Sequence, residues 1–150
     1  MKLQLLCRNM ALAACVAAAG NASAAQFKSV GAAPAVLLDA PSAKGRKVFV
    51  APRGMPVEVI LSYGEWTKVR DADGDLSWVE SRQLSDRRTL VVVTAGARLH
   101  AGSDDSTPVI LSVDRGVLLE LSEPVASGWL KVRHRDGISG FVKATDVWGE

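Results

Sequence analysis

One stretch of this chain occurs twice, and that duplication constrains the fold more than any other feature. Residues 64–70 read GEWTKVR and residues 128–133 read GWLKVR, so that Trp129 lies 63 residues after Trp66. An Asp-Gly pair and then an aromatic-Val pair follow in both copies at the same spacing of 63, and upstream residues such as Gly54 and Gly116 match at a spacing of 62. A repeat of this kind indicates two copies of one structural unit, each of about 55 residues.

Each copy consists of short segments typical of β-strands. Residues 56–62 (PVEVILS) alternate so that Val57, Val59 and Leu61 are predicted to share one face. In residues 66–70, Trp66, Lys68 and Arg70 are expected on the face opposite Thr67 and Val69, and residues 129–133 repeat that parity. Asp73-Gly74 and Asp136-Gly137 predict tight hairpin turns, since glycine accepts the positive φ that such turns need. Further strands are expected at 35–38, 48–50, 97–100, 109–111 and 117–122, with no amphipathic helix.

About five short strands in each copy fit a small barrel, because closure hides the edges of so short a sheet. The sequence therefore predicts an all-β protein of two tandem small β-barrels. The expected division is a signal peptide at 1–25, an extended lead-in at 26–34, a first barrel at 35–86 and a second at 87–150.

The first residues indicate export. Lys2 and Arg8 give a basic start, a small-residue apolar run follows at 10–20, and Ala22-Ser23-Ala24 has the form that signal peptidase accepts. We expect cleavage after Ala24 or Ala25 and a periplasmic product. The apolar run is shorter than the roughly 20 residues of a membrane span. The alternative is a lipobox at 12–15 (LAAC), which would make the protein a lipoprotein anchored through Cys15.

Removal of the signal changes the composition in two respects. Both cysteines, Cys7 and Cys15, lie within it, so the cleaved chain would hold neither a disulfide nor a thiol. The signal also carries Lys2 and Arg8 and no acid, so it accounts for the formal net charge of +2. A neutral chain lacks the basic surface of a nucleic-acid-binding protein, and we expect no nucleic-acid partner.

The repeated motif resembles that of the bacterial Src-homology-3 (SH3-like) domain: Gly-x-Trp-x-Lys-Val, a turn with Asp-Gly, an aromatic-Val pair and a hydrophobic closing residue. Leu84 and Val147 occupy the closing positions, and the resemblance extends from about Val36 to Trp148. It implies two tandem SH3-like β-barrels. The Asn and Arg that often open the family's first strand are absent from both copies, and Ser77 replaces a glycine that the second copy keeps as Gly140.

No catalytic or metal-binding pattern is recognisable. Bacterial SH3 domains often accompany papain-like hydrolases, which need a Cys nucleophile, and the cleaved chain has none. A hydrolase using serine and His134 is the remaining enzymatic alternative, although no Gly-x-Ser-x-Gly occurs. Residues 71–75 (DADGD) are similar to the start of a calcium loop, but Arg82 stands at the twelfth position, where a Glu would close it. We expect no cofactor and no metal.

The aromatic residues of the two hairpins are the candidate ligand site. Trp66 and Trp78 are expected roughly opposite each other across the first turn, and Trp129 and Phe141 across the second. Such rings could line a groove for an extended peptide or glycan. The basic residues beside them could meet the carboxylates of peptidoglycan stem peptides, and the loop at 42–47 (SAKGRK) is a further basic segment. The candidate residues are Tyr63, Trp66, Trp78, Trp129, Phe141, Trp148, Lys68, Arg70, Lys131 and Arg133.

These features predict a non-catalytic binding or adaptor protein, with peptidoglycan or an envelope protein as its partner. The alternative is a structural accessory subunit of an envelope complex that binds no small ligand. The exposure of the aromatic rings distinguishes these two functions, because complete burial of all four hairpin rings would favour the accessory subunit.

Overall fold

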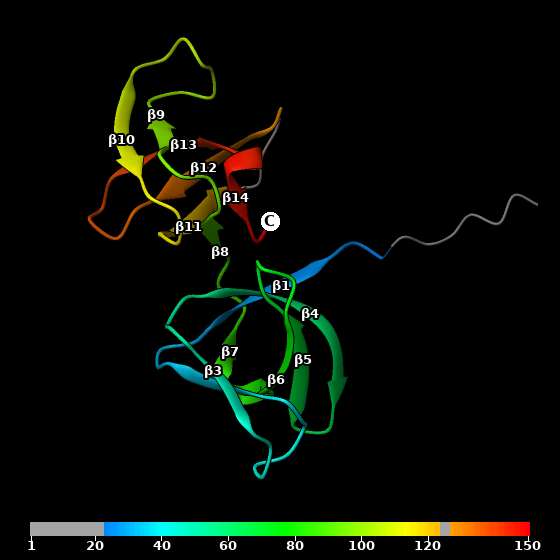
Figure 1. Cartoon of the computed structure of the whole chain (residues 1–150). Coiled ribbons are helices and arrows are strands. Elements are labelled where there is room, and N and C mark those ends of the chain that lie inside the picture. Colours follow the sequence, from blue (N-terminus) through cyan, green and yellow to red (C-terminus); the bar gives the residue numbers. More distant parts are fainter. Residues whose placement is uncertain (1–22, 124–126) are drawn as a thin grey trace, which may run out of the picture.

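The computed structural model describes residues 23–123 and 127–150, which form two seven-stranded antiparallel sheets, each rolled into a small barrel (Figure 1). The predicted signal peptide and the lipobox at 12–15 lie almost entirely outside the described residues. The first sheet contains β1 (Gln26–Val30), β2 (Ala35–Leu38), β3 (Lys47–Ala51), β4 (Pro56–Tyr63), β5 (Trp66–Arg70), β6 (Leu76–Glu80) and β7 (Leu84–Ser85). The second contains β8 (Thr89–Val92), β9 (Ala97–His100), β10 (Val109–Val113), β11 (Leu118–Glu123), β12 (Trp129–Arg133), β13 (Ser139–Lys143) and β14 (Val147–Trp148).

The duplication seen in the sequence is a duplication of topology. The strand order is β3-β2-β6-β5-β4-β1-β7 in the first sheet and β10-β9-β13-β12-β11-β8-β14 in the second, so each strand has its counterpart at the same place. A short 3₁₀ turn precedes the last strand of each barrel, at Ser81–Gln83 and at Ala144–Asp146. Within the described residues no helix has the length and apolar character needed to cross a membrane. The prediction of two tandem β-barrels is confirmed.

The segment 26–34, expected as a lead-in ahead of the first barrel, is instead part of the sheet. Its residues Gln26–Val30 form β1, which pairs with β4 and, at Ser29 and Val30, with β7. β1 is the counterpart of β8, since Lys28 lies opposite Val57 as Leu90 lies opposite Leu119. The first barrel therefore begins structurally at Gln26, and β1 was missed because its sequence, QFKSV, alternates poorly.

One strand departs from its predicted parity. Val59 lies opposite Val69, but the register then shifts, so that Leu61 lies opposite Lys68. Such a bulge adds one residue to one strand and turns the following side chains to the other face. Leu61 was expected on the inner face with Val57; it lies on the outer face and is 46% exposed.

Each barrel has its own core of small and branched apolar residues. The first core contains Val57, Val69 and Val79, all at most 1% exposed, and the second contains Leu119, Val132 and Val142 at the corresponding positions. Tight packing of this kind fixes the strands and hence the outward side chains that alternate with them.

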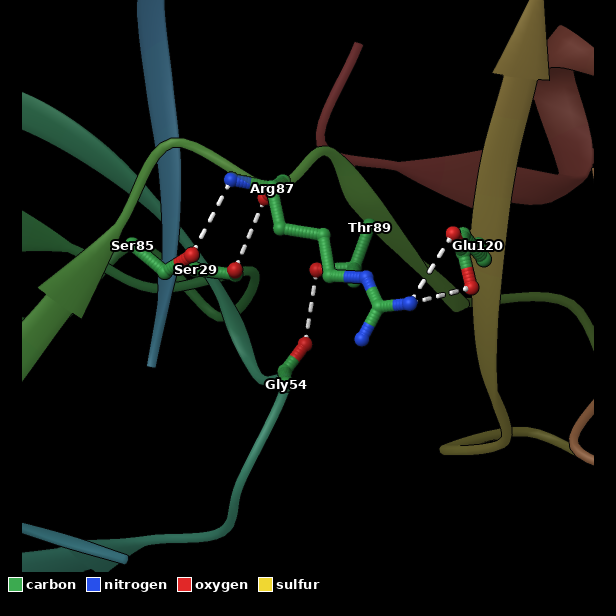
Figure 2. A network of polar contacts seen from close by, with 6 residues as sticks. All are labelled: Ser29, Gly54, Ser85, Arg87, Thr89 and Glu120. Carbon is green, nitrogen blue, oxygen red and sulfur yellow. Dashed lines mark hydrogen bonds and ion pairs between the residues drawn. The ribbon is translucent and has the colours of Figure 1, made fainter. Parts of the chain in front are cut away.

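The two barrels meet around β8, and Figure 2 shows the polar contacts there. The Thr89 hydroxyl donates to the carbonyl oxygen of Gly54 at 2.6 Å, and the Ser29 hydroxyl donates to that of Arg87 at 2.7 Å. The Arg87 guanidinium reaches both carboxylate oxygens of Glu120 at 3.2 Å. The linker at 86–88 is thus hydrogen-bonded to both barrels.

Candidate functional site

The outer face of the β5–β6 hairpin carries the predicted site residues of the first barrel. Thr67 and Val69 are buried, whereas Trp66 and Lys68 are half-buried and Arg70 is exposed, which agrees with the predicted parity. The two rings are not opposite each other, however: Trp66 faces Glu80 and Trp78 faces Lys68. The expected pairing was wrong by two residues of register, and the rings are diagonal neighbours on one face.

Tyr63 and Leu61 extend this face onto β4. Tyr63 lies opposite Trp66 in the ladder, and Leu61 reaches the same side because of the β4 bulge. Tyr63 is 66% exposed, the highest value among the large apolar and aromatic side chains of the described residues. The first barrel therefore presents an accessible strip of apolar and aromatic groups, which we call the outer strip: Leu61, Tyr63, Trp66 and Trp78.

Positive charge lies along the outer strip. The ammonium nitrogen of Lys68 is 5.8 Å from the centre of the Trp78 ring, within the range of a cation–π contact. Arg70, the next outward residue of β5, is held by Glu58 at 3.2 Å. Lys68 thus adds a cation to an aromatic surface, whereas the charge of Arg70 is partly compensated.

The corresponding face of the second barrel carries Trp129 and Phe141, which are half-buried. The Lys143 ammonium lies 5.6 Å from the centre of the Trp129 ring, and the His100 ring meets Trp129 edge-on at 5.1 Å. Phe141 faces Lys131 across the ladder. Lys131 bonds Glu123 at 2.8 Å, while Arg133 is exposed and takes part in no ion pair among the described residues.

The two histidines have local structural contacts. His100 is 7% exposed, and its Nδ1 lies 3.0 Å from the carbonyl oxygen of Thr107, which ties down the loop between β9 and β10. The Nδ1 of His134 accepts the backbone N–H of Asp136 at 3.3 Å in the second hairpin turn. Within 23–123 and 127–150, no hydrogen bond joins either histidine to a serine.

The acidic hairpin at 71–75 is a hydrogen-bonded turn. One carboxylate oxygen of Asp71 accepts the backbone N–H groups of Asp73 at 3.0 Å and Asp75 at 2.9 Å, and Gly74 adopts φ +91°. The part of the chain that the structure describes contains no group of three or more potential metal ligands. The basic loop at 42–47 is likewise organised by a carboxylate, because Asp39 accepts the backbone N–H of Arg46 at 2.8 Å and pairs with its guanidinium.

Trp148 does not join either hairpin cluster. Its ring meets the ring of Phe27 edge-on at 5.1 Å, and the Arg88 guanidinium lies 5.6 Å from the centre of the Phe27 ring. Phe27 belongs to β1 of the first barrel and Trp148 to β14 of the second, and the C-terminus lies beside β1 in Figure 1. Trp148 therefore packs the two barrels against each other.

A cavity at the junction of the barrels was missed by the sequence analysis. Its volume is about 570 Å³, and it lies between the first barrel's β3 and acidic hairpin on one side and β8 and β11 on the other. No local pattern reveals such a cavity, because residues from both repeats are needed to enclose it. Its walls are Leu37, Asp39, Val48, Phe49, Pro52, Met55, Pro56, Asp71, Ala72, Asp73, Asp75, Leu76, Ser77, Val91, Gly116 and Leu118.

A second hollow of about 410 Å³ lies in the second barrel alone. Its polar wall includes His100, Arg98 and Asp146, together with the ion pair between Lys143 and Asp105 at 2.7 Å. None of the residues predicted as ligand contacts lines either cavity.

Comparison with known proteins agrees with the repeat. The chain matches the family described as bacterial SH3 domain twice, over residues 31–86 and 93–149. No curated protein sequence matches it. One similar solved structure is NlpC2 of Trichomonas vaginalis, which is 11% identical with a TM-score of 0.38, over 84% of this chain and 48% of its own. Another is NlpC1 of Trichomonas vaginalis, which is 9% identical with a TM-score of 0.40, over 89% of this chain and 49% of its own. An NlpC/P60 family protein of Bacillus cereus is 16% identical with a TM-score of 0.38, over 82% of this chain and 56% of its own.

The chain thus spans about half the length of these similar structures. The two family matches cover most of both barrels, but each begins just after the first strand of its sheet, β1 or β8. This chain belongs to the bacterial SH3 domain family and carries two such domains in tandem.

Proposed function

We propose that this chain is an exported, non-catalytic binding protein that recognises cell-wall peptide or glycan through the outer strip of its first barrel. Two bacterial SH3 domains in tandem indicate a binding module. The observation that carries the finer proposal is the accessible strip itself, with Tyr63 66% exposed and Lys68 above the Trp78 ring. Aromatic rings stack on sugar rings and peptide planes, and an ammonium group attracts the carboxylates of stem peptides.

Exposure of the rings favours binding over a purely structural accessory role. Trp66, Trp78, Trp129 and Phe141 are all half-buried, and none is fully covered. An accessory subunit that used these rings only for packing would be expected to bury all four.

Export rests on the sequence of the first 25 residues. Cleavage after Ala24 or Ala25 would leave β1 intact, since that strand begins at Gln26. Cell fractionation with N-terminal sequencing tests this step: a periplasmic product beginning near Gln26 supports it. A membrane fraction that becomes soluble in a Cys15→Ser variant would establish the lipoprotein instead.

Wall binding is tested by sedimenting the purified protein with peptidoglycan sacculi. A Tyr63→Ala, Lys68→Ala variant changes only outward side chains, so it should fold normally and lose at least about fivefold in affinity. Lys131→Ala is the matched control, because Lys131 occupies the position of Lys68 in the second barrel and is paired with Glu123. If the unaltered protein stays in the supernatant, wall binding is wrong and an envelope protein becomes the leading partner.

A further inference from the structure

The cavity at the barrel junction is a second candidate binding site, distinct from the outer strip. Its volume of about 570 Å³ falls within the range of ligand sites, which occur preferentially between domains. Strands of both barrels enclose it: Val91 and Leu118 come from β8 and β11, and Val48 and Phe49 come from β3.

Apolar side chains form one wall of this cavity and remain accessible. Three of these side chains are about half exposed, at 47% for Val48, 50% for Phe49 and 51% for Leu76. Apolar side chains of this size are ordinarily buried in a core. Clustered exposure of this kind is typical of interaction sites. β3 is also the last strand of its sheet, paired with β2 alone, so half of its backbone hydrogen-bonding groups face outward.

The charged residues that line the cavity are all acidic. Four carboxylates line the cavity, and no lysine, arginine or histidine is among the lining residues. The Asp71 carboxylate is committed to backbone N–H groups, and Asp39 is paired with Arg46. Asp75 takes part in no ion pair among the described residues. The lining carboxylates are Asp39, Asp71, Asp73 and Asp75.

A guanidinium group already contacts one of these carboxylates. Arg115, which precedes the lining residue Gly116, extends from the second barrel to Asp73 at 3.4 Å. Both side chains are well exposed, at 66% and 75%, and a pair in that setting is weak. The carboxylate can therefore hold a cationic side chain and exchange it for another.

We propose that this cavity binds an extended segment of a partner protein in which basic and apolar side chains alternate. The apolar residues would fill the wall of Val48, Phe49 and Leu76, and the basic residues would meet Asp73 and Asp75 in place of Arg115. The backbone of the segment would lie along the free edge of β3. Peptidoglycan stem peptides carry carboxylates of their own, so the sign of the lining disfavours them here and favours a basic protein segment.

Binding is tested by fluorescence anisotropy with two labelled, terminally blocked peptides, one alternating leucine with arginine and the other leucine with glutamate. The arginine peptide is expected to bind the purified protein and the glutamate peptide is not. An Asp73→Asn, Asp75→Asn variant should weaken the arginine peptide about tenfold at low salt. Asp136→Asn is the matched control, because Asp136 lies at the corresponding hairpin turn of the second barrel, away from the cavity, and should change nothing.

The variant Arg115→Ala gives the most specific test of the proposal. Removal of the resident guanidinium should raise the affinity for the arginine peptide by about twofold to fivefold, since the ligand no longer competes for Asp73. An unchanged or lowered affinity in this variant would overturn the proposal, as would equal binding of the glutamate peptide. Displacement of the arginine peptide by soluble peptidoglycan fragments would assign the cavity to the wall instead. Sacculus binding is measured separately and can fail or succeed without affecting this result.

Discussion

Gly140 shows how the two copies of the motif diverged at a single residue. A Cβ atom at this position would lie 2.9 Å from the carbonyl oxygen of His100 and 2.8 Å from Cδ1 of Ile110. The first barrel holds Ser77 at the corresponding place, opposite Val69 as Gly140 lies opposite Val132. The residue that corresponds to Ile110 is Val48, which lacks a Cδ1 atom, so the first barrel has room that the second has filled.

Gly140→Ser is therefore expected to destabilise the protein by about 1–3 kcal/mol, because the added atoms overpack a filled space. Chemical denaturation measures the loss. Adding Ile110→Val should recover part of it, while the backbone clash with His100 remains. Ser77→Gly, the reverse change in the first barrel, should cost less than Gly140→Ser; equal losses would contradict the packing explanation.

Lys28 and Asp86 provide a prediction on pH. The Lys28 ammonium donates a hydrogen bond to Asp86, and that bond together with its positive charge lowers the pKa of the Asp86 carboxyl. Because the folded pKa lies below the unfolded one, the pair stabilises the protein above about pH 4 and this contribution is lost as the pH falls through the folded pKa. Lys28→Met should return the pKa of Asp86 towards its ordinary value, as measured by NMR titration of the carboxyl carbon.

Asp104 is the internal reference for that titration. Its pKa is lowered by the backbone N–H of Ser106, which donates to its carboxylate at 2.7 Å, so the cause does not involve Lys28. In the Lys28→Met variant the Asp104 titration should not move. A parallel shift of both groups would indicate a general change of fold.

At the scale of elements, alternation and turn chemistry predicted most of the strands. Asp73-Gly74 and Asp136-Gly137 lie at hairpin turns where the glycines adopt φ +91° and +86°, as expected from their sequence. β1 was missed because Lys28 occupies the position that Leu90 fills in the second core. The bulge in β4 and the barrel-junction cavity could not be predicted, because each depends on long-range pairing or packing that no local period encodes.

The edge strand β3 exposes a run of apolar side chains and carries a single charge, that of Lys47 at its start. Val48, Phe49 and Val50 are all at least 47% exposed, and natural edge strands ordinarily carry charges or prolines that prevent pairing with another chain. The corresponding β10 exposes Val109 and Ile110 at 45% and 42%. Each barrel thus leaves an apolar edge strand accessible.

We expect this edge to cause weak self-association at high protein concentration. Val50→Lys places a charge on the most exposed apolar residue of β3, outside the cavity lining, and should shift the protein towards the monomer without lowering its stability. Sedimentation velocity over a concentration series measures the change. If the unaltered protein is already monomeric throughout that series, the edge of β3 does not pair with another chain, and something other than its own residues prevents that pairing.

At the scale of the whole molecule, the two barrels pack directly against each other as well as being linked through the chain. Pro56 at the start of β4 is fully buried, and Leu118 of the second barrel approaches Gly54 of the first. The Phe27–Trp148 contact and the hydrogen bond from Arg88 to the Gly149 carbonyl oxygen at 3.0 Å close the same junction. The junction cavity depends on this arrangement, because its two sides belong to different barrels.

Gly149 is the residue at which this arrangement can be broken without touching either core. A Cβ atom there would lie 2.7 Å from the Thr89 carbonyl oxygen and 3.0 Å from Cβ of Pro56, and the residue adopts φ +120°. Gly149→Ala should therefore separate the barrels, enlarge the radius of gyration measured by small-angle X-ray scattering, and split thermal unfolding into two transitions. Gly137→Ala is the matched control: at φ +86° it bears a backbone cost of about 1–2 kcal/mol, but no atom lies within 4 Å of its added methyl group. An unchanged scattering curve for Gly149→Ala would mean that the junction accommodates the added methyl group by a local adjustment. Expansion in this variant alone would show that close packing at Gly149 holds the barrels together.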